Sequence, residues 1–134
     1  MDLSKIKTDE QAQAAEVDGL WTEVSVLGEV CEMKIARLGN RKYERLLDRK
    51  LEPHRRKRGR ISNEVRDRIM VECVAEAILL DWRGLKNGDE PFDYSYDNAV
   101  LLLTQYRDVY DAVLIAANEA ERFRLDQIEE DAGN

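Results

Sequence analysis

Few side chains of this sequence have the types and spacing that catalysis or metal binding requires. The one histidine, His54, lies in a run of basic residues, and no partner for a catalytic triad is in view. Asp89, Glu90 and Asp93 form a small acidic group without the ordered ligand positions of a calcium loop. No GxSxG, HExxH or glycine-rich phosphate-binding motif is present. The sequence therefore predicts a protein that is not an enzyme and has no catalytic residues, cofactor or metal site.

The two cysteines, Cys31 and Cys73, lie 42 positions apart without a CxxC motif, which disfavours a zinc site and a disulfide framework. Both have apolar neighbours, where a free cysteine acts as a small hydrophobic residue. This usage is typical of a cytosolic protein. No apolar run approaches the roughly 20 residues of a membrane-spanning helix, and the first residues lack a secretory signal pattern. We expect a cytoplasmic protein with no membrane partner.

Charge is concentrated in residues 41–60, the basic segment. It holds ten Lys or Arg against three acidic residues, a net charge of +7, whereas the whole chain carries −7. Arg55 and Arg56, in its basic run, could contact phosphates, but Tyr43 is the segment's one aromatic residue for stacking on bases. Three interpretations of the basic segment stay open. It is a solvated or internally paired surface, a contact for an acidic protein partner, or a contact for nucleic acid, which is the least favoured.

The segment beyond residue 73 is unusually apolar. Four consecutive apolar residues, 100–103, lie on one short predicted helix, whose geometry prevents all of them from facing one core. Packing against the last helix explains most of this apolar surface, and the functional alternative is a groove for a partner's helix or a self-association face. The candidate partner-binding residues are Trp82, Leu85, Phe92, Val100, Leu101, Leu102 and Leu103, together with Arg55 and Arg56 of the basic segment.

The local patterns predict where these residues are held. Apolar and polar residues alternate with a period of two over residues 20–38, which predicts a β-hairpin that turns at residues 27–29, with a helix over 21–37 as the competing interpretation. Further on, apolar residues recur at helical spacing. The predicted helices are residues 41–52, capped by Asn40 and stopped by Pro53; a central helix capped by Ser62 that continues to Trp82; a short helix capped by Ser95 that ends at Thr104; and a long helix from Arg107.

Length and composition favour one domain. The chain has 134 residues, of which 43% are hydrophobic and 37% charged. We predict a mainly α fold, a small helical domain with an N-terminal β-hairpin. Residues 1–18 are expected to be a flexible arm, residues 19–126 the domain, and residues 127–134 an acidic, frayed tail.

The order of these features resembles the tail assembly chaperones of long-tailed, non-contractile bacteriophages of the siphovirus type. The resemblance covers roughly residues 20–126. Its pieces are informative only together and in order. In chain order they are a Trp-containing hairpin that ends in Lys34-Ile35-Ala36-Arg37, then Gly39-Asn40-Arg41-Lys42-Tyr43 and the basic helix with Leu46-Leu47, Pro53 and Arg55-Arg56. They continue with the run from Ala75 to Gly84 (AEAILLDWRG), Pro91-Phe92, the run from Tyr96 to Leu103 (YDNAVLLL) and an amphipathic helix that ends in Arg122-Phe123-Arg124.

The resemblance implies a non-enzymatic scaffold that acts in the cytoplasm of the bacterial host. Such proteins coat the tape-measure protein, recruit tail-tube subunits and are absent from the mature virion, and many also have a longer, frameshifted form. The family has no short catalytic signature, so no residue roles are carried over. Two alternatives stay open, a nucleic-acid-binding protein that uses residues 41–60 and a structural head–tail connector or adaptor subunit.

Overall fold

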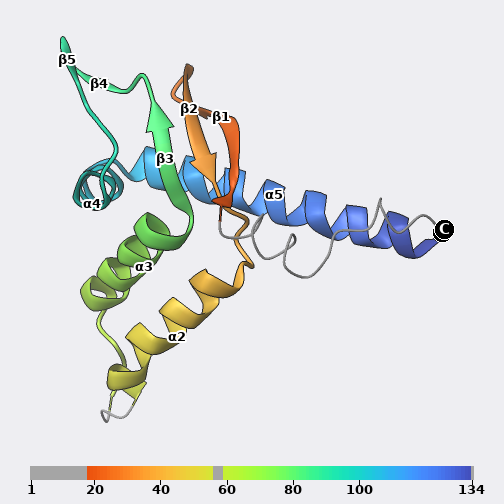
Figure 1. The fold of residues 1–134 in the computed structure, drawn as a ribbon. Helices are drawn as coiled ribbons and strands as arrows, with labels where there is room; N and C mark the ends of the chain where they lie inside the picture. Colours follow the sequence, from red (N-terminus) through yellow and green to blue (C-terminus); the bar gives the residue numbers. More distant parts are fainter. Residues whose placement is uncertain (1–17, 56–58, 134) are drawn as a thin grey trace.

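The computed structural model describes residues 18–55 and 59–133 of the chain (Figure 1). Strands come first, helices follow, and a third strand and a small hairpin interrupt the helices. In chain order the elements are β1 (Leu20–Val26), β2 (Glu29–Ile35), α2 (Arg41–Arg55), α3 (Asn63–Ala77), β3 (Leu79–Arg83), β4 (Lys86–Asn87), β5 (Glu90–Pro91), α4 (Tyr96–Gln105) and α5 (Arg107–Gly133).

The predicted N-terminal β-hairpin is confirmed. β1 and β2 pair antiparallel, and Val26 lies opposite Glu29 across a two-residue turn. Both turn residues have positive φ angles, 51° for Leu27 and 84° for Gly28. This is the type I′ geometry, whose twist matches that of the strands it joins. On the inward face of the predicted alternation Val24, Met33 and Ile35 are buried, whereas Val26 and Cys31 are half-buried.

The prediction that the central helix continues to Trp82 is wrong. Helix α3 ends at Ala77, and the chain then forms β3. β3 pairs antiparallel with β2, so that Met33 lies opposite Trp82 in a three-stranded sheet of order β1-β2-β3. A short apolar run such as residues 77–82 fits a buried helix or a buried strand equally well. The free edge of β2 decides between them, since it offers backbone hydrogen-bond partners that a longer α3 would leave unpaired.

The predicted N-caps of α3 and α4 are confirmed, whereas the C-terminal ends of α2 and α5 differ from prediction. The side chains of Ser62 and Ser95 accept the backbone N–H three residues further on, as N-caps do. Pro53 does not stop α2 at residue 52, because a proline in the last turn removes one backbone bond and the helix still reaches Arg55. Residues 127–133, expected to fray, are helical as the end of α5.

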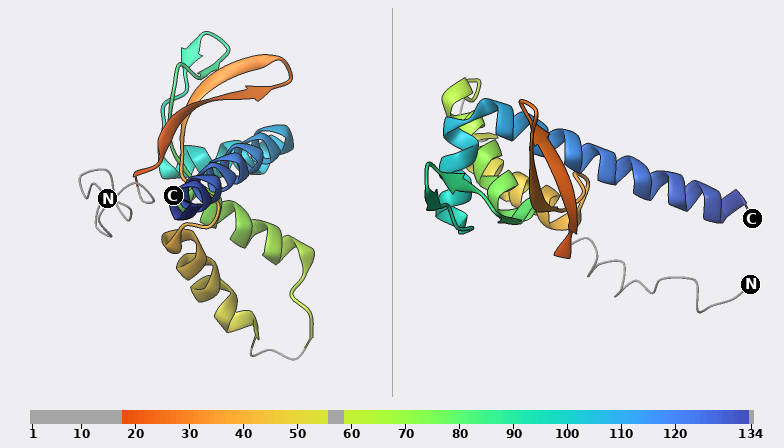
Figure 2. Two further views of the ribbon diagram at one scale, coloured as in Figure 1. Left: turned by 90° about the vertical axis from the view of Figure 1, so that its right-hand side faces the viewer. Right: turned by 90° about the horizontal axis from the view of Figure 1, so that it is seen from above.

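The sheet and α4 lie against the first half of α5, and α3 packs against α4 and β3. β1 and β2 lie against α5, and α2 and α3 form an antiparallel pair that projects from the opposite side of the body (Figure 2). The fold is therefore mainly α with a substantial sheet. Residues 1–17 of the predicted arm lie outside the described residues, and the domain boundaries stay a prediction. The largest fully buried apolar side chains are those of Met33, Ile78, Leu79, Val74, Val113 and Cys73.

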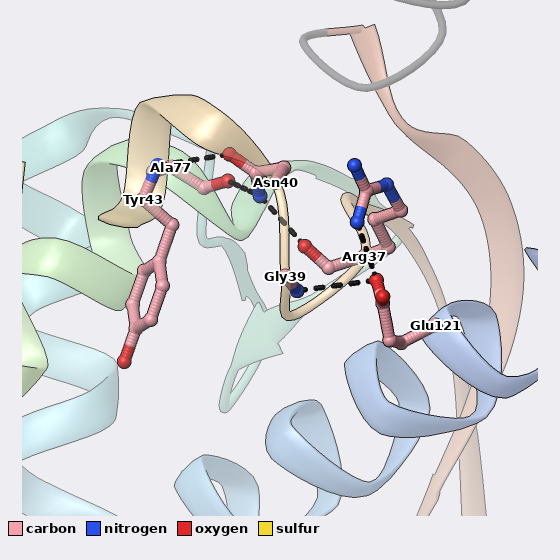
Figure 3. A network of polar contacts seen from close by, with 6 residues as sticks. All are labelled: Arg37, Gly39, Asn40, Tyr43, Ala77 and Glu121. Atoms are coloured by element: carbon pink, nitrogen blue, oxygen red, sulfur yellow. Dashed lines mark hydrogen bonds and ion pairs between the residues drawn. The ribbon is translucent and has the colours of Figure 1, made fainter. Parts of the chain in front are cut away.

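A buried asparagine joins α2 to the end of α3 (Figure 3). Asn40 is 1% exposed, and its Oδ1 accepts the N–H of Tyr43 at 2.9 Å as the N-cap of α2. Its Nδ2 donates to the carbonyl oxygens of Arg37 at 2.7 Å and Ala77 at 3.1 Å. One amide side chain thus caps one helix and satisfies a carbonyl at the end of the next.

The same junction fastens α5 to the chain after β2 (Figure 3). Arg37 Nη1 lies 2.6 Å from Glu121 Oε2, and the N–H of Gly39 donates to the same oxygen at 3.2 Å. The N–H of Leu38 donates to the carbonyl oxygen of Ala117 at 3.1 Å. These contacts fix α5 at its middle, so that its C-terminal part extends past the body.

Candidate functional site

An apolar pocket of about 250 Å³ opens between the segment after β3, α4 and the first turn of α5. Its walls come from successive elements of the chain, between positions 85 and 109. The residues that line it are Leu85, Lys86, Asn87, Phe92, Leu101, Leu102, Gln105, Tyr106 and Val109.

The loop that forms one wall is shaped by two glycines. Gly84, at φ 70°, ends β3, and Gly88, at φ 66°, forms the turn between β4 and β5. The N–H of Phe92 donates to the carbonyl oxygen of Leu85 at 2.8 Å and closes the base of the loop. Leu85 and Phe92, both half-buried, are therefore held side by side at the pocket.

Trp82 supports this wall from behind. Its ring stacks on Phe92 with centroids 5.7 Å apart and meets Tyr94 edge-on at 5.0 Å. Its Nε1–H donates to the carbonyl oxygen of Phe92 at 2.7 Å. Trp82 is 5% exposed and belongs to the core, so among the candidate residues it positions Phe92 and does not line the pocket.

Helix α4 divides the apolar run at 100–103 between two environments. Leu101 and Leu102 line the pocket, and Leu101 is 44% exposed. Leu103 is 2% exposed in the core, and Val100 is half-buried outside the pocket. Successive helical residues point about 100° apart, so a run of four has to face both the core and the surface.

Sequence reasoning missed the pocket residues at the junction of α4 and α5. Tyr106 follows the last residue of α4 and donates its N–H to the carbonyl oxygen of Leu102 at 3.0 Å. Its side chain is 54% exposed and lines the pocket with Val109 of α5. The sequence offered one signal for this position, the aromatic residue Tyr106 at the break between two predicted helices. Lys86, Asn87 and Gln105, the polar residues of the pocket, had no signal in the pattern.

The chemistry of the pocket is that of apolar contact. Among the described residues that line it there is no histidine, cysteine, carboxylate or hydroxyl other than that of Tyr106. In residues 18–55 and 59–133 no group of three His, Cys, Asp or Glu side chains is placed to hold a metal ion. The pocket can accept apolar side chains, and amide and ammonium groups are available to hydrogen-bond at its edge.

The basic segment is partly paired and partly open. Arg55, one of the candidate residues, lies 2.6 Å from Asp48 and 3.6 Å from Glu52, so its charge is already matched within α2. Arg56 lies outside the described residues. Four exposed cations of α2 form no ion pair with any described residue, and we call them the basic stripe: Arg41, Lys42, Arg45 and Arg49.

Both cysteines are free thiols. Burial raises the pKa of Cys73 to about 11, and burial followed by the nearby Glu32 carboxylate raises the pKa of Cys31. A thiol reacts as its thiolate, so both are poor nucleophiles near neutral pH. None of the described helices is long and apolar enough to span a bilayer.

Most of the chain matches a known protein family. The family model described as YdaY prophage protein matches residues 38–134, which include the apolar pocket and the basic segment but not β1 and β2. No curated protein and no solved structure matches the chain.

Proposed function

The chain belongs to the YdaY prophage protein family, and from this premise we propose that it is a non-enzymatic tail assembly chaperone of the siphovirus type. In this role it binds the tape-measure protein during tail assembly and brings tail-tube subunits to it. It acts in the cytoplasm of the bacterial host and is left out of the mature virion. The resemblance over residues 20–126, the prophage family and the apolar pocket support the proposal.

The pocket is the observation that carries it. A long helical protein aggregates in water if its apolar faces stay exposed before assembly. Covering those faces stabilises the complex by a free energy of about 25 cal/mol per Å² of apolar surface buried. Leu101 and Tyr106 remain largely exposed at the pocket, where they can contact a helix laid across it. An amphipathic helix would place one or two apolar side chains between Phe92 and Leu102, as in other helix-in-groove complexes.

Charge favours solubility of the complex. The chain carries a net charge of −7, and a net charge well away from zero keeps an assembly soluble. Lys86 and Gln105 at the pocket can hydrogen-bond the polar side of a bound helix. The basic segment offers a second, electrostatic contact for an acidic part of the partner.

Co-expression tests the proposal. An apolar fragment of the tape-measure protein of the same prophage is expected to be insoluble alone and soluble with the wild-type chain. Leu101→Glu places a charge in the pocket and should remove at least about nine-tenths of the solubilised fragment, because a buried unpaired charge costs several kcal/mol. The measurement is the amount of fragment in the soluble fraction and in a pull-down.

Thr104→Glu is the matched control, since Thr104 is exposed on the same helix and does not line the pocket. It should solubilise the fragment as the wild type does. The proposal fails if the fragment is equally soluble without the protein. If Thr104→Glu and Leu101→Glu lose the effect equally, the pocket is not the binding site.

Mass spectrometry of purified phage particles separates a chaperone from a connector. The proposal predicts tape-measure and tail-tube peptides in the virion and none from this chain. A stoichiometric amount of this chain in the particle would show that it is a structural subunit.

A further inference from the structure

The C-terminal part of α5 has an apolar side that no other element of residues 18–55 and 59–133 covers. Leu125 and Ile128 are 52% and 49% exposed, and Ala132 follows on the same side at helical spacing. This side continues the one on which Glu121 contacts Arg37, but it lies beyond the body (Figure 1). We call Leu125, Ile128 and Ala132 the α5 stripe.

Carboxylates flank the α5 stripe. Asp126, Glu129, Glu130 and Asp131 are exposed, and in the part of the chain that the structure describes none of them forms an ion pair. The last turn of α5 contains no basic residue. The C-terminal end of a helix carries a partial negative charge, so four acidic residues there are unfavourable until cations approach from outside.

The basic stripe of α2 is complementary to this surface. Arg41, Arg45 and Arg49 recur every four residues and therefore lie along one side of the helix, with Lys42 beside them. Their charges are unmatched within the described residues. The hydrocarbon stems of such side chains can cover apolar groups while the charged ends reach carboxylates.

Within one chain the two surfaces cannot meet. α5 packs against β1, β2 and α4, and its end extends away from the body in one direction, whereas α2 projects in another (Figures 1 and 2). A second copy of the chain, however, offers a basic stripe that is free to approach.

We propose that the acidic end of α5 docks along α2 of a second copy. The α5 stripe lies on the stems of Arg45 and Arg49, and the carboxylates of Glu129 and Glu130 pair with their guanidinium groups. Each copy then has one α5 end to give and one α2 to receive, so the contact closes as a reciprocal two-fold dimer or continues into a ring or an open chain. This contact goes beyond the proposed function and does not depend on it.

Charge reversal on either side tests the contact. Analytical ultracentrifugation of the wild-type chain is expected to show association that grows with concentration and weakens between about 50 mM and 1 M NaCl, because salt screens exposed charges. Arg45→Glu/Arg49→Glu and Glu129→Lys/Glu130→Lys should each weaken association by at least about tenfold, since like charges then face each other. Circular dichroism checks that α5 remains helical in both variants.

Arg60→Glu/Arg66→Glu is the control for net charge, because it makes the same change at exposed residues outside both surfaces. It should associate as the wild type does. The decisive experiment mixes the two reversal variants, in which an acidic α2 now meets a basic α5 end. Association should return to within a few-fold of the wild type.

Three results would overturn the proposal. The wild type could be a monomer at every concentration, the reversal variants could associate as the wild type does, or the mixture could fail to associate. If Arg45→Glu/Arg49→Glu abolishes duplex DNA binding in a gel shift and leaves association unchanged, the basic stripe is a nucleic-acid surface and not a docking site for α5.

Discussion

At the residue scale, Asn40 connects two helices through a single amide. Asn40→Ala removes the cap on Tyr43 and the side-chain donor to the carbonyl oxygens of Arg37 and Ala77, although Arg37 keeps the backbone N–H of residue 40 at 3.2 Å. We expect a loss of about 2–3 kcal/mol in the free energy of unfolding, measured by urea denaturation. Asn40→Asp keeps the acceptor for Tyr43 but sets a carboxylate against two carbonyl oxygens, so it should be the more destabilising variant at pH 7.

The pH dependence of Asn40→Asp checks this assignment. Burial beside two carbonyl oxygens raises the pKa of the introduced carboxyl, and the protonated form can donate to one of them. The difference from the wild type should therefore shrink as the pH falls from 7 to 5. A difference that stays constant over this range would mean that the amide nitrogen of Asn40 contributes little.

Cys73 makes the protein sensitive to alkali. Burial raises its pKa to about 11, whereas an unfolded thiol ionises near 8.5. Near neutral pH both states keep the proton. As the pH rises from 9 to 11 the unfolded state loses it first, so the free energy of unfolding falls by roughly 2–3 kcal/mol. Urea denaturation at several pH values should show this fall, and Cys73→Ala should make it shallower; equal slopes would contradict the prediction.

At the element scale, the β1–β2 turn contains a strained leucine. Leu27 has a φ of 51° and is 86% exposed, and this backbone region costs a residue with a Cβ about 1–2 kcal/mol. Leu27→Asn suits a type I′ turn, and we expect thermal denaturation to show a gain of about 0.5–1 kcal/mol. Leu27→Ala keeps the strain and should give no gain. Equal stability of both variants would show that the turn is not under strain.

At the scale of the whole molecule, the body and the end of α5 have separate roles. Residues 125–132 are exposed, so deletion of residues 126–134 should leave the free energy of unfolding within about 0.5 kcal/mol of the wild type. The same deletion should abolish the salt-dependent association, because it removes Ile128 and the carboxylates. A large loss of stability would show that the end of α5 belongs to the folded body.

Parts of the fold and of the site were predictable because their causes are local. The alternation through Met33, the side-chain caps at Ser62 and Ser95 and the start of α5 at Arg107 depend on residues a few positions apart. The apolar character of Leu85 and Phe92 is also visible in the sequence, but their place in a pocket is not. The sequence could not distinguish the core residues Trp82 and Leu103 from the pocket residues Leu85 and Phe92, because all four are apolar residues in one region.

The sequence alone determined which segments alternate, where most helices begin and where charge and apolar residues concentrate, because neighbouring residues set backbone preference and periodicity. The tertiary structure decided what residues 79–83 become, since a strand needs an edge and β2, 44 or more positions earlier, supplies it. It also decided which apolar residues line a pocket and which cations stay unpaired. Those outcomes depend on packing between distant elements, and no local pattern encodes them.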